Sequence, residues 1–294
     1  MRRQLRTGVG LAMVVAVLCA FGATTAQAFW NPAEFFGFGD RVAVVEITGL
    51  ISTSSEILEN LKTFREDPRV RAIVLRVNSP GGAVGPSQEI MKEVERTKKV
   101  KKVVASFGSM ATSGGYYAAC AADVIMANPG TATGSIGVIL KLANLEELAK
   151  KVGVDVYSLK SGALKDIGDP FQPLTPEGRK VLQELLDDIH EQFIRDVAQN
   201  RQLPLEKVQT LADGRIFTGE QAKKLGLVDA LGNFNDAVEQ AGRLGGIKGT
   251  VKTVYPEKKG ISLLSLLLGQ DISKNLEALT LPYPEPAFLP PGFH

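Results

Sequence analysis

The sequence predicts an α/β fold with a mainly parallel sheet, because short apolar runs typical of buried strands alternate with segments of helical periodicity. The chain has 294 residues, enough for one or two domains with a sizeable core. Its content of 44% hydrophobic and 22% charged residues is ordinary for a globular protein. The net charge of +2 is too near zero to favour a nucleic-acid partner.

The N-terminus has the layout of a secretory signal. Three arginines precede an apolar run over residues 9–23, and small residues follow up to Ala28. The uncharged stretch is also long enough to span a bilayer if it is not cleaved. We therefore expect residues 1–28 to be either a cleaved signal peptide or a membrane anchor, followed by a linker at residues 29–40. In both cases the basic end stays cytoplasmic and the rest of the chain crosses the membrane.

The main domain is expected over residues 41–255, followed by a C-terminal tail at residues 256–294. Its expected strands cover residues 42–47, 72–77, 103–107, 123–127, 136–140 and 154–159. Its expected helices cover residues 55–64 and 87–97, a short alanine-rich segment after residue 113, a long segment from residue 176 to residue 197, and residues 218–225. The long helix has the clearest start, because Thr175 can cap it and Pro176 fits its first position.

Two glycine-rich turns follow expected strands and carry the candidate chemistry. Ser113 opens the sequence SGGYY, where its hydroxyl would face the free N–H groups of a helix N-terminus. The alternative is that Ser113 only caps this helix. The sequence NSPGG at residues 78–82 ends another strand, so the N–H groups of Gly82 and Gly114 can together hold an oxyanion. The alternative is a simple turn from strand to helix.

A lysine is the natural partner for this serine. The chain has only two histidines, His190 and His294, so a serine hydrolase built on histidine is hard to assemble. An exposed lysine is protonated at neutral pH and is useless as a base, so we expect Lys165 to be buried, with the neighbouring Asp166 pointing elsewhere. Lys160 is the second candidate, and for any lysine the alternative is a solvated loop residue.

Taken together, these segments resemble the signal peptide peptidase A family of bacterial serine proteases. The resemblance runs from about residue 41 to residue 254, and its motifs occur in the family's order. The matching stretches are VNSPGG at 77–82, SMATSGGYY at 109–117, TGSIGV at 133–138, the segment 161–171 with its KD pair, GRIFTG at 214–219 and LGLVD at 225–229.

The resemblance implies a fold like that of the Clp protease subunit and crotonase. It also implies a Ser/Lys dyad in which Ser113 is the nucleophile and Lys165 the general base. Ser135 would hydrogen-bond the lysine amine and orient it, and Gly82 and Gly114 would supply the oxyanion N–H groups. The resemblance implies no cofactor and no metal.

The resemblance further implies a homo-oligomer in which the lysine reaches the serine of a neighbouring subunit. Such an enzyme would sit on the outer, periplasmic face of the bacterial cytoplasmic membrane, anchored through its N-terminus or released. Its substrates would be signal-peptide remnants and other membrane-associated polypeptides.

Two other functions compete with this one: a crotonase-type enzyme acting on an acyl-thioester, and a catalytically inactive envelope scaffold. The export signal and the serine–lysine pair argue against them.

The proline-rich tail matches no motif of the family. It could lie along the groove or bind a partner, but its composition favours disorder.

Overall fold

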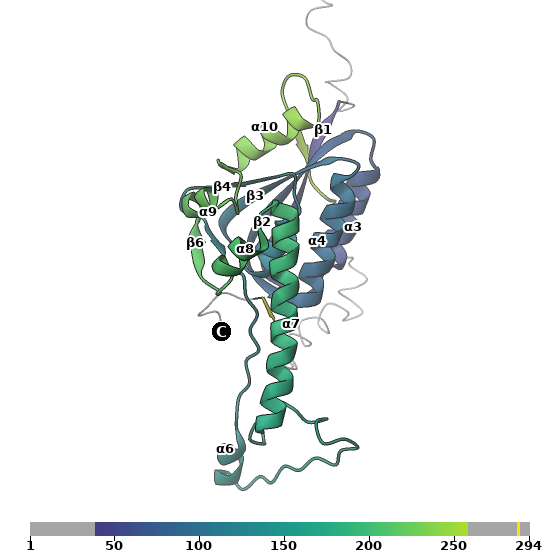
Figure 1. Ribbon diagram of the computed structural model, residues 1–294. Helices are drawn as coiled ribbons and strands as arrows, with labels where there is room; N and C mark the ends of the chain where they lie inside the picture. Colours follow the sequence, from purple (N-terminus) through teal and green to yellow (C-terminus); the bar gives the residue numbers. More distant parts are fainter. Residues whose placement is uncertain (1–38, 258–286, 289–294) are drawn as a thin grey trace, which may run out of the picture. The chain divides into compact units, whose positions relative to one another are not determined.

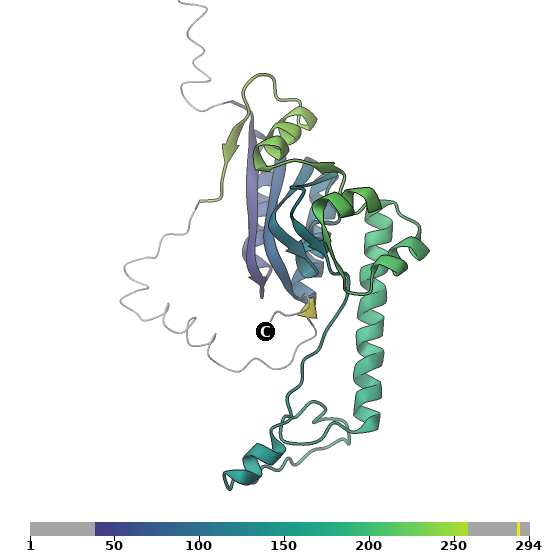
Figure 2. The ribbon, with the colours of Figure 1, turned by 90° about the vertical axis from the view of Figure 1, so that its left-hand side faces the viewer.

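A computed structural model describes residues 39–257 and 287–288 of the chain. In this part the expected α/β fold is confirmed, with a mainly parallel sheet covered by helices on both faces (Figures 1 and 2). The main path of the sheet runs β6-β5-β3-β2-β1-β8. The strands are β1 (Arg41–Ile51), β2 (Val70–Ala83), β3 (Lys102–Thr112), β4 (Val124–Ala127), β5 (Ala132–Gly134), β6 (Ile216–Thr218), β7 (Ala230–Leu231), β8 (Lys252–Val254) and β9 (Ala287–Phe288).

The strand pairings are parallel except at two places, where β5 pairs with β6 and β2 pairs with β9. Helices connect the parallel strands, as crossover connections require. The helices are α3 (Ser55–Glu66), α4 (Val84–Lys98), α5 (Gly114–Ala119), α6 (Glu146–Lys151), α7 (Pro176–Arg201), α8 (Leu205–Leu211), α9 (Gly219–Leu225) and α10 (Phe234–Leu244).

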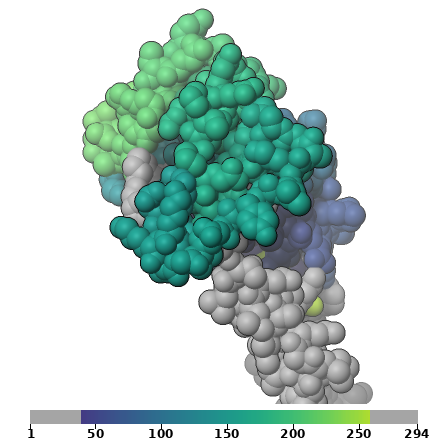
Figure 3. Space-filling model, turned by 90° about the horizontal axis from the view of Figure 1, so that it is seen from below, coloured from purple at the N-terminus to yellow at the C-terminus, as the bar shows by residue number. Residues whose placement is uncertain are grey.

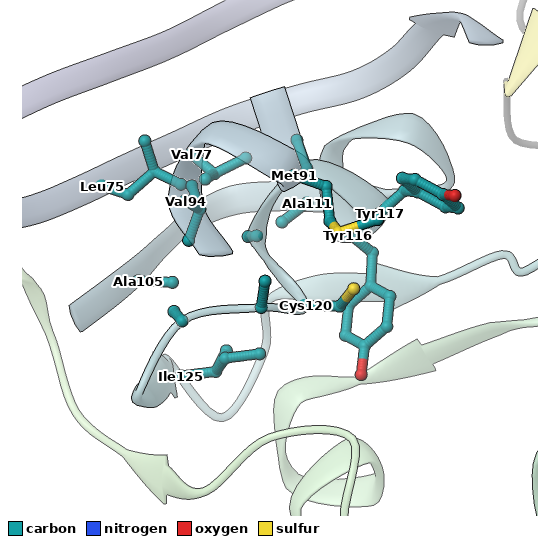
Figure 4. Close-up of a cluster of buried hydrophobic side chains, with 14 of the residues drawn as sticks. Leu75, Val77, Met91, Val94, Ala105, Ala111, Tyr116, Tyr117, Cys120 and Ile125 are labelled. Atoms are coloured by element: carbon teal, nitrogen blue, oxygen red, sulfur yellow. The ribbon is translucent and has the colours of Figure 1, made fainter. Parts of the chain in front are cut away.

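The central strands are buried on both faces, because successive side chains of a strand point to opposite sides of the sheet. On β1, Val45 and Ile47 join the larger apolar cluster, which includes side chains of α3, α4, α5 and α7. Val42 and Val44 join a second cluster that packs against α10. Figure 4 shows part of the larger cluster, including side chains of β2, α4 and α5.

Three expectations about the strands are wrong: two expected strands do not form, and one strand is longer than expected. The expected strand at residues 136–140 is replaced by β5, because Gly134 and Ser135 have positive φ values of 79° and 52° that end the extended conformation. The segment 154–159 is irregular and exposed, so its apolar alternation has no neighbouring strand to pair with. In contrast, β2 continues through the NSPGG turn to Ala83, because β1 stays paired beside it as far as Gly82.

The long helix α7 begins as expected and is buried over only part of its length. The Thr175 hydroxyl accepts a hydrogen bond from the Gly178 N–H at 3.0 Å, and Pro176 occupies the first helical position. Phe193 and Val197 are buried, and the Phe193 ring contacts Tyr117 of α5. Nearer the start of the helix, Val181 and Leu185 are exposed.

Residues 140–175, which we call the arm, connect β5 to α7 and contain α6. The views in Figures 1 and 2 agree that α6 lies well away from the sheet, near the N-terminal end of α7. Seen from below, the arm and α7 form much of the near surface (Figure 3). Many large apolar side chains of the arm are exposed: Leu145, Leu148, Val152, Val154, Val156, Tyr157, Leu159 and Leu164.

The expected signal peptide or anchor at residues 1–28 lies outside the described residues, as does nearly all of the expected linker. Among the helices that are described, none combines the length and apolarity needed to cross a bilayer. Of the tail, residues 256–257 and 287–288 are described. Ala287 and Phe288 form β9, so the expectation of disorder is wrong for these two residues.

Candidate active site

Ser113 occupies a strained turn between β3 and α5. Its backbone has φ 51° and ψ −118°, a conformation that costs a residue other than glycine about 1–3 kcal/mol. The side chain is fully buried, and its Oγ has no hydrogen-bond partner within the described structure. The hydroxyl makes no capping bond to α5, so the interpretation of Ser113 as a simple helix cap is wrong. A strained, buried and unpaired hydroxyl is typical of a catalytic position.

Ser135 lies beside the Ser113 turn, immediately after the neighbouring strand β5. The Ser113 N–H donates to the Gly134 carbonyl oxygen at 2.7 Å, which places Ser135 one residue beyond this contact. Ser135 is 1% exposed, and its own N–H donates to the Arg215 carbonyl oxygen at 2.8 Å. Both serines therefore sit in left-handed turns at the ends of adjacent strands, held by backbone hydrogen bonds.

Gly82 occupies a position where the backbone approaches another strand closely, and Gly114 is buried at the start of α5. A Cβ atom built on Gly82 would lie 2.1 Å from the Ile51 carbonyl oxygen, so only glycine fits there. Gly114 follows Ser113 as the first residue of α5 and is buried. The next residue, Gly115, packs against β2, since a Cβ on it would lie 2.9 Å from the Ser79 carbonyl oxygen.

Hydrogen bonds join the end of β2 to the Ser113 turn. The Thr112 hydroxyl donates to the Pro80 carbonyl oxygen at 3.1 Å, which ties the residue before Ser113 to the NSPGG segment. Asn78 Oδ1 accepts from the N–H groups of Ser109 and Met110 at 3.1 and 3.3 Å. These bonds satisfy backbone donors where the register between β2 and β3 shifts.

Lys165 lies in the arm, between α6 and α7, and its side chain is exposed within the single chain. Its backbone N–H donates to the Gly162 carbonyl oxygen at 3.1 Å, and the side chain borders an open hollow beside Glu177. None of its described contacts is with Ser113 or Ser135. The burial expected for Lys165 is therefore not provided by its own chain.

Lys160 is committed to an ion pair. Its Nζ lies 2.7 and 2.8 Å from the two carboxylate oxygens of Asp166. The hydrogen bond from Lys160, followed by one from Gln172, lowers the pKa of the Asp166 carboxyl. Asp166 thus pairs with Lys160 rather than with Lys165, as expected from the need for an uncompensated amine.

Comparison with known proteins identifies the family. The profile of peptidase family S49 matches residues 95–248. The chain belongs to peptidase family S49. It is 48% identical to a candidate protease of Synechocystis over 70% of this chain and 75% of the relative. It is 42% identical to a candidate signal peptide peptidase of Enterococcus faecium, over 68% of this chain and 62% of the relative. Protease 4 of Salmonella typhi is 38% identical over 71% of this chain, which spans 35% of that longer protein.

The S49 chain is therefore a serine protease of the signal peptide peptidase A family with a Clp-protease-like α/β fold. The matched region includes Ser113, Gly114, Ser135 and Lys165, whereas Gly82 precedes it. The structure brings the first three of these and the end of β2 into one neighbourhood. It leaves Lys165 on the arm.

The sequence did not identify the residues that hold the site of this S49 protease in shape. Thr112 and Asn78 bridge β2 and β3, and the Ser79 hydroxyl donates to the Gly49 carbonyl oxygen at 2.6 Å while accepting from the Gly81 N–H at 3.1 Å. The available signal was their position inside the NSPGG and SMATSGGYY segments. Polar residues with short side chains at such turns commonly bond nearby backbone groups.

Proposed function

We propose that this chain is a serine endopeptidase that uses a Ser113/Lys165 dyad and works through an acyl-enzyme. One observation carries the proposal: Ser113 is buried in a strained backbone conformation, and its Oγ bonds to no other described group. A residue held in this state without a structural hydrogen bond is better explained by reactivity than by stability. Membership of a serine protease family supports this assignment.

Lys165 would come from a neighbouring copy of the chain. Within one chain its side chain is exposed, and it lies on the arm among apolar side chains that are also exposed, such as Leu159 and Leu164. Val181 and Leu185 continue this apolar surface along α7. Packing of copies through the arm would cover these side chains and carry Lys165 away from water, which favours its neutral form.

The reaction then proceeds by acyl transfer. Neutral Lys165 accepts the proton of Ser113 as Oγ attacks the peptide carbonyl carbon, and the displaced electron pair moves to the carbonyl oxygen. The N–H groups of Gly82 and Gly114 stabilise this oxyanion. When the C–N bond breaks, the lysine ammonium returns its proton to the leaving amine. Water next attacks the acyl ester with the same lysine as base, which releases the acid and restores the Ser113 hydroxyl.

Ser135 would orient the lysine amine. Its backbone is fixed by the bond to the Arg215 carbonyl oxygen, and it lies next to the residue that holds the Ser113 N–H. A base within hydrogen-bond reach of its nucleophile generally needs a third group to hold it there. A small, rigid hydroxyl in this place meets that requirement.

The proposed substrates are signal-peptide remnants and other membrane-associated polypeptides at the bacterial cell envelope. The secretory layout of residues 1–28 supports export, and the similarity to bacterial signal peptide peptidase and Protease 4 relatives supports an envelope role. Family membership favours this function over a crotonase-type acyl-thioester enzyme and over an inactive scaffold.

The decisive experiment is labelling with a fluorophosphonate probe, which reacts with activated serines. The wild-type protein should label at one site, and the Ser113→Ala variant should not label although it melts at a similar temperature. Ser109→Ala serves as a matched control, because this serine lies in the same segment and should not affect labelling. Labelling that persists in Ser113→Ala would remove the proposed nucleophile.

A further inference from the structure

The starts of four neighbouring strands carry an excess of positive charge. β8, β1, β2 and β3 lie side by side and run parallel, so their first residues share one edge of the sheet, at the top of Figures 1 and 2. The acidic residues in the connections into these strands and in their first two positions are Asp40 and Asp67. The basic residues in the same segments, which we call the basic face, are Arg41, Arg69, Arg71, Lys99, Lys101, Lys102, Lys248 and Lys252.

The register of the strands brings these basic residues together from separate parts of the sequence. Arg41 is directly opposite Lys252 of β8, and on its other side it is opposite the first residue of β2. Lys102 is opposite the third residue of β2. Between these two pairings β2 has one extra residue, so Arg71 lies in a bulge, and its side chain is exposed. Basic residues of four strands therefore lie next to one another along this edge.

Carboxylates neutralise part of this charge. Lys99 and Lys248 are exposed, and their side chains bond to no other described residue. The basic face thus presents charge to whatever lies beyond the edge of the sheet. Its printed ion pairs are Arg69–Asp67, at 3.2 Å, and Lys102–Asp123, at 2.8 Å.

Two exposed apolar side chains lie at the same edge. Val100 is largely exposed and stands between two lysines of the basic face. Leu244 is exposed at the end of α10. The next residue, Gly245, packs against the bulge, since a Cβ on it would lie 3.0 Å from the Arg71 carbonyl oxygen. Apolar side chains flanked by lysines suit a membrane surface, because the apolar group enters the acyl region while the ammonium groups stay with the phosphates.

The opposite end of the same strands has the opposite charge. The hollow beside the second half of β1 is lined by Glu46, Glu56 and Glu257, and its described lining includes no lysine or arginine. An anionic surface therefore attracts the strand starts and repels the strand ends. Ser113 follows the end of β3, so the basic face is separate from the proposed reaction site.

We propose that the basic face, together with Val100 and Leu244, binds the surface of an anionic phospholipid bilayer. The sequence favours a bilayer over a soluble anion, because the apolar run at residues 9–23 precedes β1. The linker at residues 29–40 spans at most about 40 Å when fully extended, so a retained anchor keeps this edge near the membrane. If the segment is cleaved, the basic face itself holds the released protein at the membrane. The proposal does not use Ser113 or Lys165, so it and the proposed proteolysis can fail separately.

A tryptophan placed on this surface tests the contact in the full-length protein. Trp30 is the single native tryptophan, so the W30F/V100W variant carries one reporter, beside the lysines of the basic face. The matched control is W30F/L50W, because Leu50 is also exposed but lies near the other end of β1. Each protein is mixed with vesicles of phosphatidylglycerol and phosphatidylcholine whose brominated acyl chains quench tryptophan on contact.

The emission of W30F/V100W should fall at least about twofold with phosphatidylglycerol present, and by much less on phosphatidylcholine alone. The emission of W30F/L50W should stay unchanged. Equal quenching of the two variants, or no quenching of W30F/V100W, would overturn the proposal. Binding of heparin, a soluble polyanion, without quenching by lipid would assign the face to another anionic partner and would also overturn it.

Charge removal tests the same surface in a second way. In the W30F/V100W protein, the added change K99Q/K102Q/K248Q should raise the phosphatidylglycerol concentration for half-maximal quenching roughly a hundredfold, at about fivefold for each charge. K207Q/K223Q/K224Q, which removes three exposed lysines of α8 and α9, is the matched control and should leave that concentration unchanged.

Hydrolysis of a soluble peptide should be the same in both triple variants, because neither touches the proposed reaction site. Unchanged lipid binding in K99Q/K102Q/K248Q, or equal loss in the two triple variants, would overturn the proposal, since net charge alone would then explain the binding. A protein that binds lipid as described but cleaves no peptide would overturn the proposed function and leave this inference standing.

Discussion

Lys160 and Lys165 are close in the sequence but differ in what surrounds their amines. Lys160 is paired with Asp166, whereas Lys165 is exposed on the arm. We expect Lys165→Ala to lower kcat/KM by about 10²–10⁴, the usual contribution of a general base. The melting temperature of the isolated chain should barely change, because the side chain is exposed. Steady-state peptide hydrolysis together with thermal melting provides the measurement.

The control for this change is Lys160→Ala, which removes a neighbouring positive charge and frees Asp166. It should retain most of the activity. If Lys165 is the base, the wild-type rate should rise from acid toward alkaline pH, because only a neutral amine can accept the serine proton. Substantial turnover by a folded Lys165→Ala protein, or a rate that stays flat down to about pH 5, would move the base elsewhere.

The turn at residues 213–215, which contacts Ser135, contains an ion pair whose contribution to stability depends on pH. Arg215, whose carbonyl oxygen receives the Ser135 N–H, also binds Asp213 through its guanidinium group. The hydrogen bond from Arg215 lowers the pKa of Asp213 from its usual 3.8 to about 2. Because the pKa is lower in the folded state, the stabilising contribution is complete above about pH 4 and is lost as the pH falls through about 2.

We therefore expect the melting temperatures of wild type and Asp213→Asn to differ by a small, constant amount between about pH 5 and 8. The difference should shrink only below about pH 4, as wild type also loses the charge. Both partners are largely exposed, so the effect is modest. Thermal melts across the pH range measure it. A difference that changes between about pH 5 and 8 would show that another group controls this turn.

At the scale of elements, α7 fixes the short helix that follows the nucleophile. Phe193 is fully buried and packs edge-to-face on Tyr117 of α5, with ring centroids 4.5 Å apart. Phe193→Ala should lower the free energy of unfolding by about 3–5 kcal/mol, since it leaves a cavity. It should also slow labelling of Ser113, because α5 loses support. Val100→Ala, at a residue that is 66% exposed, should change stability by less than about 0.5 kcal/mol.

Denaturant unfolding measures the free energies of unfolding of Phe193→Ala and Val100→Ala. Probe labelling at denaturant concentrations below the unfolding transition measures how fast Ser113 reacts. If Phe193→Ala is destabilised while Ser113 labels at the wild-type rate, then α7 supports the fold and not the site. If neither quantity changes, the buried contact with Tyr117 does not carry the stability assigned to it.

The elements that the sequence predicted best are those with strong local signals. The cap at Thr175 occurs as expected, and the helix expected at residues 218–225 ends at Leu225 with Gly226 as its left-handed cap, because side-chain capping and a left-handed glycine are decided within a few residues. The end of β2 was missed, because Pro80 and the glycines after it are turn-forming residues by local criteria. They stay in a strand only because β1 runs beside them, and that pairing depends on residues distant in sequence.

In the candidate site, too, features set by local sequence were predicted and features set by distant contacts were not. Ser113 was found because a serine between a strand and a glycine-rich helix is a local pattern. Its positive φ and its unpaired Oγ depend on contacts with β5, which no local pattern reveals. The same holds for the bond from Thr112 to Pro80 and for the contact of β9 with β2, since each joins segments that are distant in the sequence.

At the scale of the whole molecule, two features indicate that a second copy of the chain is needed: the exposed apolar surface of the arm, and the absence of a base near Ser113 within the described chain. The described chain contains the turn of the proposed nucleophile and the proposed oxyanion edge, but its arm carries Lys165 among exposed apolar side chains that include Tyr157 and Leu159. Exposed apolar surface of this kind marks interaction sites, including contacts between proteins. A closed ring of identical chains would cover every arm and complete every site with one kind of interface.

A ring of this kind predicts that two inactive variants rescue each other. Ser113→Ala keeps its lysine and Lys165→Ala keeps its serine, so neither should hydrolyse peptide alone. If the dyad is shared between subunits, co-refolding the two in equal amounts should restore about a quarter of the wild-type activity, the fraction of interfaces that join an intact serine to an intact lysine. Mixing either variant with the Ser113→Ala/Lys165→Ala protein is the control and should restore none. A mixture that assembles but stays inactive would mean that each chain supplies its own base, and the arm would then have to fold back onto Ser113 of the same chain.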